Sequence, residues 1–330
     1  MDGPIALAHG PEGAGNATRM LAVAEELRER DVDLELAGGG PAARFVELNG
    51  FEEYRPADLE VIDRQQDPES SLVDAVAHTS TRVLRRAAGF RRWLADVDPA
   101  LLLTDDPLAA IPAMLQGTPW FRIDHSSVSC YSATFARNAF RLWNGLTLRR
   151  SEGFFFTTVF ENAYPTKANL LPVGPVAHQP ADPERAEPVE PFDVLLAMST
   201  YASGADELRE RLEDAGYDVR QVGGPDWEEV PAMMPYHEAA DVVVTGGFSS
   251  TSEALVAGTP VLNYPFIDCQ RGLARQIEAR GVEGIDIVRS HEEVLAGVRD
   301  PPADPEFENG APAVADGLVS RLGESGSEAR

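Results

Sequence analysis

The stretch that decides the fold is Val242-Val243-Val244-Thr245-Gly246-Gly247-Phe248-Ser249-Ser250-Thr251-Ser252-Glu253-Ala254-Leu255-Val256-Ala257-Gly258-Thr259-Pro260-Val261-Leu262. Three β-branched apolar residues at its start predict a buried strand, and the two glycines predict a turn into a helix. Gly258-Thr259-Pro260 predicts the end of that helix, and residues 261–264 predict a second strand. A strand, a turn, a helix and a strand in this order are typical of an α/β sheet.

The start of this helix predicts a site for a phosphate or pyrophosphate. The first backbone N–H groups of a helix have no acceptor within the helix, and they favour an anion. Ser249, Ser250 and Thr251 add hydroxyl groups, and Glu253 in the first turn can accept hydrogen bonds from a ribose diol. The same residues also fit a structural capping box, in which Ser249 or Ser250 caps the helix together with Glu253.

Strands and helices alternate along the rest of the chain. The expected strands cover 5–8, 33–37, 100–104, 120–123, 154–156, 193–198, 218–222, 242–244, 261–264 and 284–288. The expected helices cover 16–30, 45–49, 72–95, 108–115, 205–215, 236–240, 270–280, 291–299 and 313–322, with breaks near Gly89 and at Pro112. This alternation predicts two doubly wound, parallel-sheet (Rossmann-like) α/β domains that face a cleft.

The expected division of the chain is into a first domain over 1–170, a second over 171–305 and a tail over 306–330. The tail contains one last helix and is expected to end in disorder from residue 323 onward. Ligands are expected at the carboxyl ends of the strands, where the loops 10–15 and 246–251 lie.

The charge of the chain is strongly acidic. It carries 54 Asp and Glu against 28 Lys and Arg, a net charge of −26, and Lys167 is its single lysine. Such a dispersed acidic composition resembles the proteins of extreme halophiles, because salt at about 1 M shortens the Debye length to about 3 Å and screens self-repulsion. It argues against sequence-independent nucleic-acid binding, which needs a basic face.

Targeting and redox signals are absent from the sequence. No apolar run reaches about 18 residues, and the N-terminus lacks the pattern of a signal peptide. Cys130 and Cys269 are too few for a disulfide framework or a metal cluster. These observations predict a cytoplasmic location.

A basic amphipathic stretch over 135–150 interleaves large apolar residues with Arg137, Arg141, Arg149 and Arg150. One interpretation is peripheral docking at the inner face of a membrane. The other is a helix that faces the core and exposes its arginines to solvent.

The donor-side motif resembles a known group of enzymes. The order Thr-Gly-Gly-x-Ser-Ser-Thr-x-Glu-Ala-x-x-x-Gly-Thr-Pro, followed by a strand and Pro-Phe-x-x-x-Gln, is similar to the donor half of inverting glycosyltransferases of the GT-B fold. The group that contains the lipid II-forming N-acetylglucosaminyltransferase is the most similar. The segments 10–19, 98–105 and 171–175 also resemble that group, and the likeness covers most of residues 4–298.

The resemblance implies an activity and a set of site residues. It implies transfer of N-acetylglucosamine or another hexose from a UDP-sugar to a hydroxyl of a sugar or lipid-linked acceptor, with inversion. No Asp-x-Asp at a strand end suits a divalent ion, and helix starts can stabilise the leaving diphosphate, so no metal or other cofactor is expected. Glu253 would bind the ribose, Gln270 the donor sugar, and Ser199 would belong to a second donor-side loop, where the family often has Gly-Gly-Ser. The diphosphate would be held by the backbone N–H groups of Gly247, Phe248, Ser249, Ser250 and Thr251, and Gly246 would also belong to the donor site. The acceptor-side loop would be formed by Gly13, Gly15 and Asn16.

The general base is the open point of this assignment. The family commonly has a histidine at the position of Asn16, whose amide cannot take up a proton at neutral pH. His9, Asp105 and His125 end strands at the same rim, and each is a candidate base. Each also has a structural interpretation: a hydrogen-bonded histidine for His9, a helix cap for Asp105 and a loop scaffold for His125.

Two other functions share this architecture. A nucleotide-sugar-binding subunit without activity would explain why Asn16 replaces the histidine. An epimerase of UDP-N-acetylglucosamine would need a basic pocket around the anomeric carbon, and Lys167 is the only lysine that could contribute to it.

Overall fold

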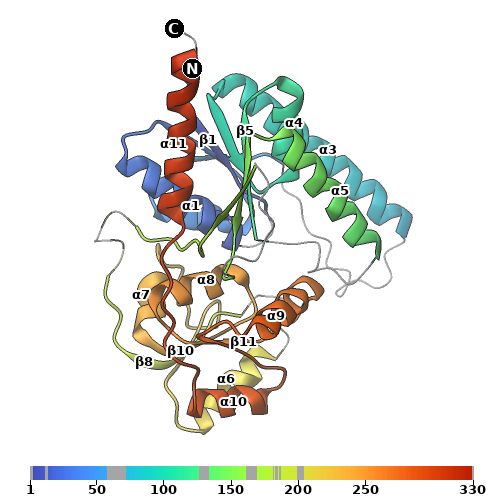
Figure 1. The fold of residues 1–330 in the computed structure, drawn as a ribbon. Coiled ribbons are helices and arrows are strands. Elements are labelled where there is room, and N and C mark those ends of the chain that lie inside the picture. Colours follow the sequence, from blue (N-terminus) through green and yellow to red (C-terminus); the bar gives the residue numbers. More distant parts are fainter. Residues whose placement is uncertain are drawn as a thin grey trace.

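The computed structural model describes residues 3–11, 14–57, 72–125, 134–160, 169–180, 182, 185, 187–198 and 204–328 (Figure 1). These residues form two parallel sheets with helices on their faces. The predicted architecture of two doubly wound α/β domains is therefore confirmed. None of the described helices is long and apolar enough to cross a membrane.

The first sheet has the strand order β3-β2-β1-β4-β5-β6-β7, and every neighbouring pair is parallel. Its strands are β1 (Ile5–Ala8), β2 (Leu34–Ala37), β3 (Glu53–Tyr54), β4 (Leu101–Thr104), β5 (Trp120–Asp124), β6 (Gly153–Thr157) and β7 (Leu170–Val173). Its helices are α1 (Ala14–Glu29), α2 (Ala43–Leu48), α3 (Leu72–Val97), α4 (Pro107–Gln116) and α5 (Thr134–Arg150), with a short 3-10 helix η1 (Gly40–Ala42) before α2.

The second sheet has the order β12-β11-β10-β8-β9 and is also parallel. Its strands are β8 (Phe192–Leu196), β9 (Val219–Gln221), β10 (Ala240–Thr245), β11 (Val261–Asn263) and β12 (Ile285–Ile287). Its helices are α6 (Ala205–Asp214), α7 (Met234–Ala239), α8 (Phe248–Ala257), α9 (Asp268–Arg280) and α10 (His291–Arg299).

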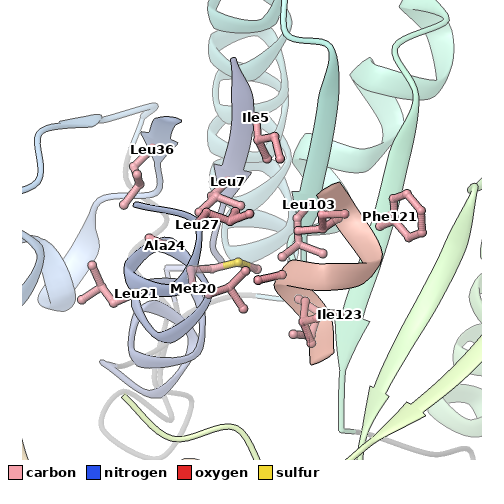
Figure 2. Close-up of a cluster of buried hydrophobic side chains, with 14 of the residues drawn as sticks. Ile5, Leu7, Met20, Leu21, Ala24, Leu27, Leu36, Leu103, Phe121 and Ile123 are labelled. Atoms are coloured by element: carbon pink, nitrogen blue, oxygen red, sulfur yellow. The ribbon is translucent and has the colours of Figure 1, made fainter. Parts of the chain in front are cut away.

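The last helix, α11 (Ala311–Glu328), returns to the first sheet and lies beside α1 (Figure 1). Apolar side chains of the sheet, such as Leu7 and Leu103, pack there against Met20 of α1 (Figure 2) and against Leu318 of α11. The prediction of disorder from residue 323 is wrong, because α11 continues through Glu328.

The two predicted helix breaks are also wrong. α3 passes through Gly89 without interruption, and the missing side chain there lets Pro56 approach, since an added Cβ would lie 3.1 Å from the Pro56 Cβ. α4 passes through Pro112, although proline removes one helical hydrogen bond. Ala109 and Ala113 of α4 are buried in a core shared with α3, and this packing offsets the loss.

The carboxyl ends of the two sheets contact each other. The Ser249 hydroxyl at the start of α8 donates a hydrogen bond of 2.9 Å to the Gly15 carbonyl oxygen in the first turn of α1. The His125 ring, just after β5, stacks on Phe248 with ring centroids 4.4 Å apart. The loops that follow the strands of each domain therefore form one shared region.

Candidate functional site

The start of α8 is an uncapped helix end that follows a short glycine loop. Gly247 is the residue before the first helical turn, and no side chain caps the helix. The Gly247 N–H donates to the Thr245 hydroxyl at 3.1 Å, and the Thr251 hydroxyl donates to the Gly247 carbonyl oxygen at 2.8 Å. The helical N–H groups that follow have no side-chain cap, and helix starts of this kind favour an anion.

Gly246 allows two loops to meet. A Cβ at this position would overlap the Tyr264 carbonyl oxygen and would lie 3.0 Å from Gln270 Oε1. Gln270 Oε1 itself accepts hydrogen bonds from the backbone N–H groups of Phe266 (2.9 Å) and Ile267 (3.3 Å). The loop after β10 and the loop after β11 are therefore packed together, with the Gln270 amide at their junction.

Glu253 is buried on α8, with 3% of its surface exposed. Its Oε2 lies 3.8 Å from His237 Nε2, which is beyond hydrogen-bond distance. Among the described residues, neither Glu253 Oε1 nor either ring nitrogen of His237 has a hydrogen-bond partner. Because a buried carboxylate is costly without hydrogen bonds, this side chain has accepting capacity to offer a hydroxyl group.

His9 is bound on both sides of its ring. Its Nε2 donates to Glu53 Oε2 at 3.0 Å and its Nδ1 donates to the Gly10 carbonyl oxygen at 2.9 Å. Burial lowers the pKa of His9, but these hydrogen bonds and the charges of Glu53 and Asp105 outweigh it, so that the pKa is raised. Burial alone would raise the pKa of Glu53, but the hydrogen bonds from His9 and from the Gly39 N–H outweigh it, so that the pKa is lowered.

Arg19 joins three of the predicted site residues. Its guanidinium donates to Asp105 Oδ2 at 2.7 Å, to Asn16 Oδ1 at 2.9 Å and to His125 Nδ1 at 3.0 Å. The other oxygen of Asp105 accepts the Gly10 N–H at 2.7 Å. No motif in the sequence predicts a role for Arg19, and the one available signal is an arginine one turn into the helix that begins at this rim.

His125 is neutral at physiological pH. Burial, and then the charge of Arg19, lower its pKa to about 4. Since an arginine can only donate, Nδ1 is the accepting nitrogen and Nε2 carries the proton. His125 thus connects Arg19 on one side with Phe248 of the donor loop on the other.

A buried ion pair behind this rim was also missed by sequence analysis. Arg86, fully buried, donates to Asp106 Oδ2 at 2.9 Å, to the Gly38 carbonyl oxygen at 2.9 Å and to the His9 carbonyl oxygen at 3.1 Å. Asp106 caps α4 by accepting the Leu108 N–H at 2.7 Å. The helix cap considered for Asp105 is therefore supplied by its neighbour.

The remaining predicted residues are placed as follows. Gly15 contacts the donor loop through its carbonyl oxygen, and a Cβ there would lie 2.6 Å from the Ser249 hydroxyl. Gly13 and Ser199 lie outside the described residues. Within the described ranges, no group of three or more His, Cys, Asp or Glu side chains is arranged to hold a metal ion.

Known glycosyltransferases are similar to this chain in sequence and in fold. Residues 14–177 match the family described as the glycosyl transferase 4-like domain. An uncharacterised glycosyltransferase of Methanosarcina mazei is 23% identical, and the match covers 77% of each chain.

Two solved structures have the same fold. The glycosyltransferase SsfS6 of Streptomyces sp. SF2575, complexed with thymidine diphosphate, has a TM-score of 0.61 at 18% identity, over 98% of this chain and 96% of that one. MurG of Acinetobacter baumannii has a TM-score of 0.57 at 15% identity, over 96% of this chain and 99% of that one. The first half of the chain thus matches a glycosyltransferase family, and the whole chain has the fold of GT-B glycosyltransferases.

Proposed function

We propose that the protein transfers N-acetylglucosamine or another hexose from a UDP-sugar to an acceptor hydroxyl, with inversion and without a metal. The observation that carries this proposal is the meeting of two helix starts, where the Ser249 hydroxyl of α8 contacts the Gly15 carbonyl oxygen of α1. Two positive helix ends, with Arg19 close by, favour a diphosphate and stabilise it as a leaving group.

The proposed donor contacts follow the order of the site. Backbone N–H groups over Gly246 to Thr251 hold the diphosphate, and the free oxygen of Glu253 accepts the ribose hydroxyls. The Gln270 amide nitrogen, which the loop contacts leave unused, donates to the donor sugar. The nucleotide base of the donor is uracil by resemblance to the lipid II-forming group, although the structure of SsfS6 is a complex with thymidine diphosphate.

We assign the role of general base to Asp105. His9 donates from both ring nitrogens, and the accepting nitrogen of His125 is occupied by Arg19. Asp105 takes the proton of the acceptor hydroxyl while that oxygen bonds to the anomeric carbon. The bond from that carbon to the diphosphate oxygen breaks with its electron pair, and the nucleoside diphosphate leaves.

The second candidate function is a nucleotide-sugar-binding subunit without turnover. It is favoured by one observation, that Asn16 occupies the position of the family's histidine and is bound to Arg19. The two functions differ in one measurement, the release of nucleoside diphosphate from a donor in the presence of an acceptor.

Donor binding gives the first prediction. Gly246→Ala weakens binding of UDP about tenfold or more, because the added Cβ overlaps the Tyr264 carbonyl oxygen and overpacking of this kind costs about 1–3 kcal/mol. Calorimetry in molar KCl, with UDP and thymidine diphosphate as ligands, measures the effect. Gly145→Ala is the control, since a Cβ there meets no atom within 4 Å. A wild-type protein that binds neither nucleotide would contradict the proposed function.

We also propose that the protein docks on an anionic membrane through the layer of α3, α4 and α5 (Figure 1). Leu84, Leu115 and Leu142, one on each of these helices, are 69%, 77% and 76% exposed. The charged side chains of α5 are all basic, and Arg141 and Arg149 are exposed. Trp143 packs inward on Trp120, so α5 both contacts the core and presents a basic, apolar outer face.

Vesicle binding tests this surface. Leu142→Asp lowers partitioning into phosphatidylglycerol vesicles about tenfold, because burial of one leucine contributes about 1.5–3 kcal/mol. Asn138→Asp, exposed one turn earlier on α5, adds the same charge without removing an apolar side chain and keeps most of the binding. Equal partitioning of the two variants in a co-sedimentation assay argues against this docking surface.

The acidic composition belongs to the same proposal. With 54 acids against 28 cations, the chain is expected to fold and work in molar salt, as a halophilic protein at the inner face of the membrane.

A further inference from the structure

A cavity of about 680 Å³ lies beside the proposed donor site. Its walls come from the loop after β11, one face of α9 and the segment after β12. The lining residues are Tyr264, Pro265, Phe266, Arg271, Ala274, Arg275, Glu278, Ile287 and Arg289. This cavity has no role in the function proposed above.

The cavity is basic, although the protein is acidic. Three arginines face one glutamate, and Arg289 donates to both oxygens of Glu278 at 2.9 Å. Arg271 and Arg275 lie one turn apart on α9, and both are exposed. Their guanidinium groups form no ion pair or hydrogen bond with any residue that the structure describes. Two free guanidinium groups on one wall suit a planar oxyanion, which arginine binds in a bidentate manner.

The order of the strands puts this cavity next to the proposed position of the donor sugar. The loop after β10 is proposed to hold the diphosphate, and Gln270 in the neighbouring loop after β11 to hold the sugar. β12 is the next strand in the sheet, and Arg289 follows it. Phe266 and the Tyr264 backbone border both Gly246 and the cavity, so they form a shared wall. A substituent on the donor sugar that points away from the diphosphate would therefore reach the arginines.

We propose that this cavity binds the carboxylate of an acidic sugar, so that the donor is a nucleotide-linked hexuronic acid. The inference rests on the proposed function and narrows the donor from hexoses in general to one with a carboxylate on its ring. The rings of Tyr264 and Phe266, with centroids 4.7 Å apart, supply the apolar wall that a sugar face packs against.

The test compares UDP, UDP-glucuronic acid and UDP-glucose by calorimetry. Wild-type protein binds UDP-glucuronic acid about 10- to 100-fold more tightly than UDP-glucose, the range expected for hydrogen bonds to a charged group. The double variant Arg271→Gln, Arg275→Gln loses this preference and keeps its affinity for UDP. Arg299→Gln removes another exposed arginine, from α10, and keeps the preference.

The outcomes separate this inference from the proposed function. UDP binding without any preference between the two sugars, or a preference that survives in the double variant, overturns the carboxylate site alone. Displacement of UDP-glucose by inorganic phosphate, lost in the double variant, overturns it in favour of a phosphate carried by the acceptor. Failure of all three nucleotides to bind overturns the proposed function together with the inference.

Discussion

Replacing Arg86 by Met lowers the free energy of unfolding by about 3–5 kcal/mol, the range measured when one partner of a buried ion pair is removed. Arg86 is fully buried, and its guanidinium binds Asp106 and the carbonyl oxygens of Gly38 and His9. The methionine fills much of the same space, so the loss reports the charge and the hydrogen bonds rather than a cavity. The side chain thus fastens the ends of β1, β2 and β4 to one another.

The Asp106 carboxylate, which is left without its ion-pair partner, accounts for most of this loss of stability. Burial already raises the pKa of Asp106, although the charge of Arg86 and the hydrogen bonds from Leu108 and Arg86 oppose it. Without Arg86 the folded-state pKa rises further above its unfolded value, so the variant loses stability as the pH rises through that pKa. Its deficit relative to wild type is therefore smaller in acid than at neutral pH.

Urea unfolding in molar KCl, followed by circular dichroism at two pH values, measures both effects. Arg85→Met is the matched control, because Arg85 is the exposed neighbour on the same helix and its loss stays within about 0.5 kcal/mol. An Arg86→Met deficit below about 1 kcal/mol, or one that does not depend on pH, would contradict the assignment of a buried, charged pair.

Local patterns predicted most strands and helices of this fold. The apolar run 242–244 and the glycines after it need only their own sequence to form β10 and the turn into α8. β3 was missed because its two residues carry no pattern. β7 was missed because it contains Pro172, which suits an edge strand with a partner on one side only. Neither strand is specified by its own residues; each forms because a neighbouring strand offers it hydrogen bonds.

The candidate site, too, could be predicted only in part from the sequence. Strand ends could be located from the sequence, so His9, Asp105 and His125 were placed at one rim. Their partners could not be read from it, because Arg19 and His125 are 106 residues apart and meet only when the sheet forms. The contact of Ser249 with Gly15 spans 234 residues and the two domains. Pairings over such distances depend on the packing of whole elements, which a local pattern does not contain.

Asp105→Asn lowers turnover about 10²- to 10⁴-fold, the contribution expected from a general base. The amide cannot take up the acceptor proton, but its oxygen can still accept a hydrogen bond from Arg19 or from the Gly10 N–H. Donor affinity is expected to stay within a few-fold of wild type, because the hydrogen bonds of this side chain go to Arg19 and the Gly10 N–H, not to the start of α8. Release of UDP from the donor in the presence of an acceptor measures turnover, and calorimetry with UDP measures binding.

The pH dependence of turnover separates Asp105 from the two histidines. His125, with its pKa of about 4, remains neutral between about pH 6 and 8, so it contributes no change in turnover over that range. A fall in turnover as the pH is lowered, which disappears in His9→Gln, would instead assign the base to His9, whose pKa is raised. Asp98→Asn is the control for the substitution itself, since Asp98 is exposed and follows α3 away from the rim. Because Asp105 also holds Arg19, the decisive result is lost turnover with UDP binding retained: loss of both would mean that Asp105 only positions Arg19 and the loop at Gly10.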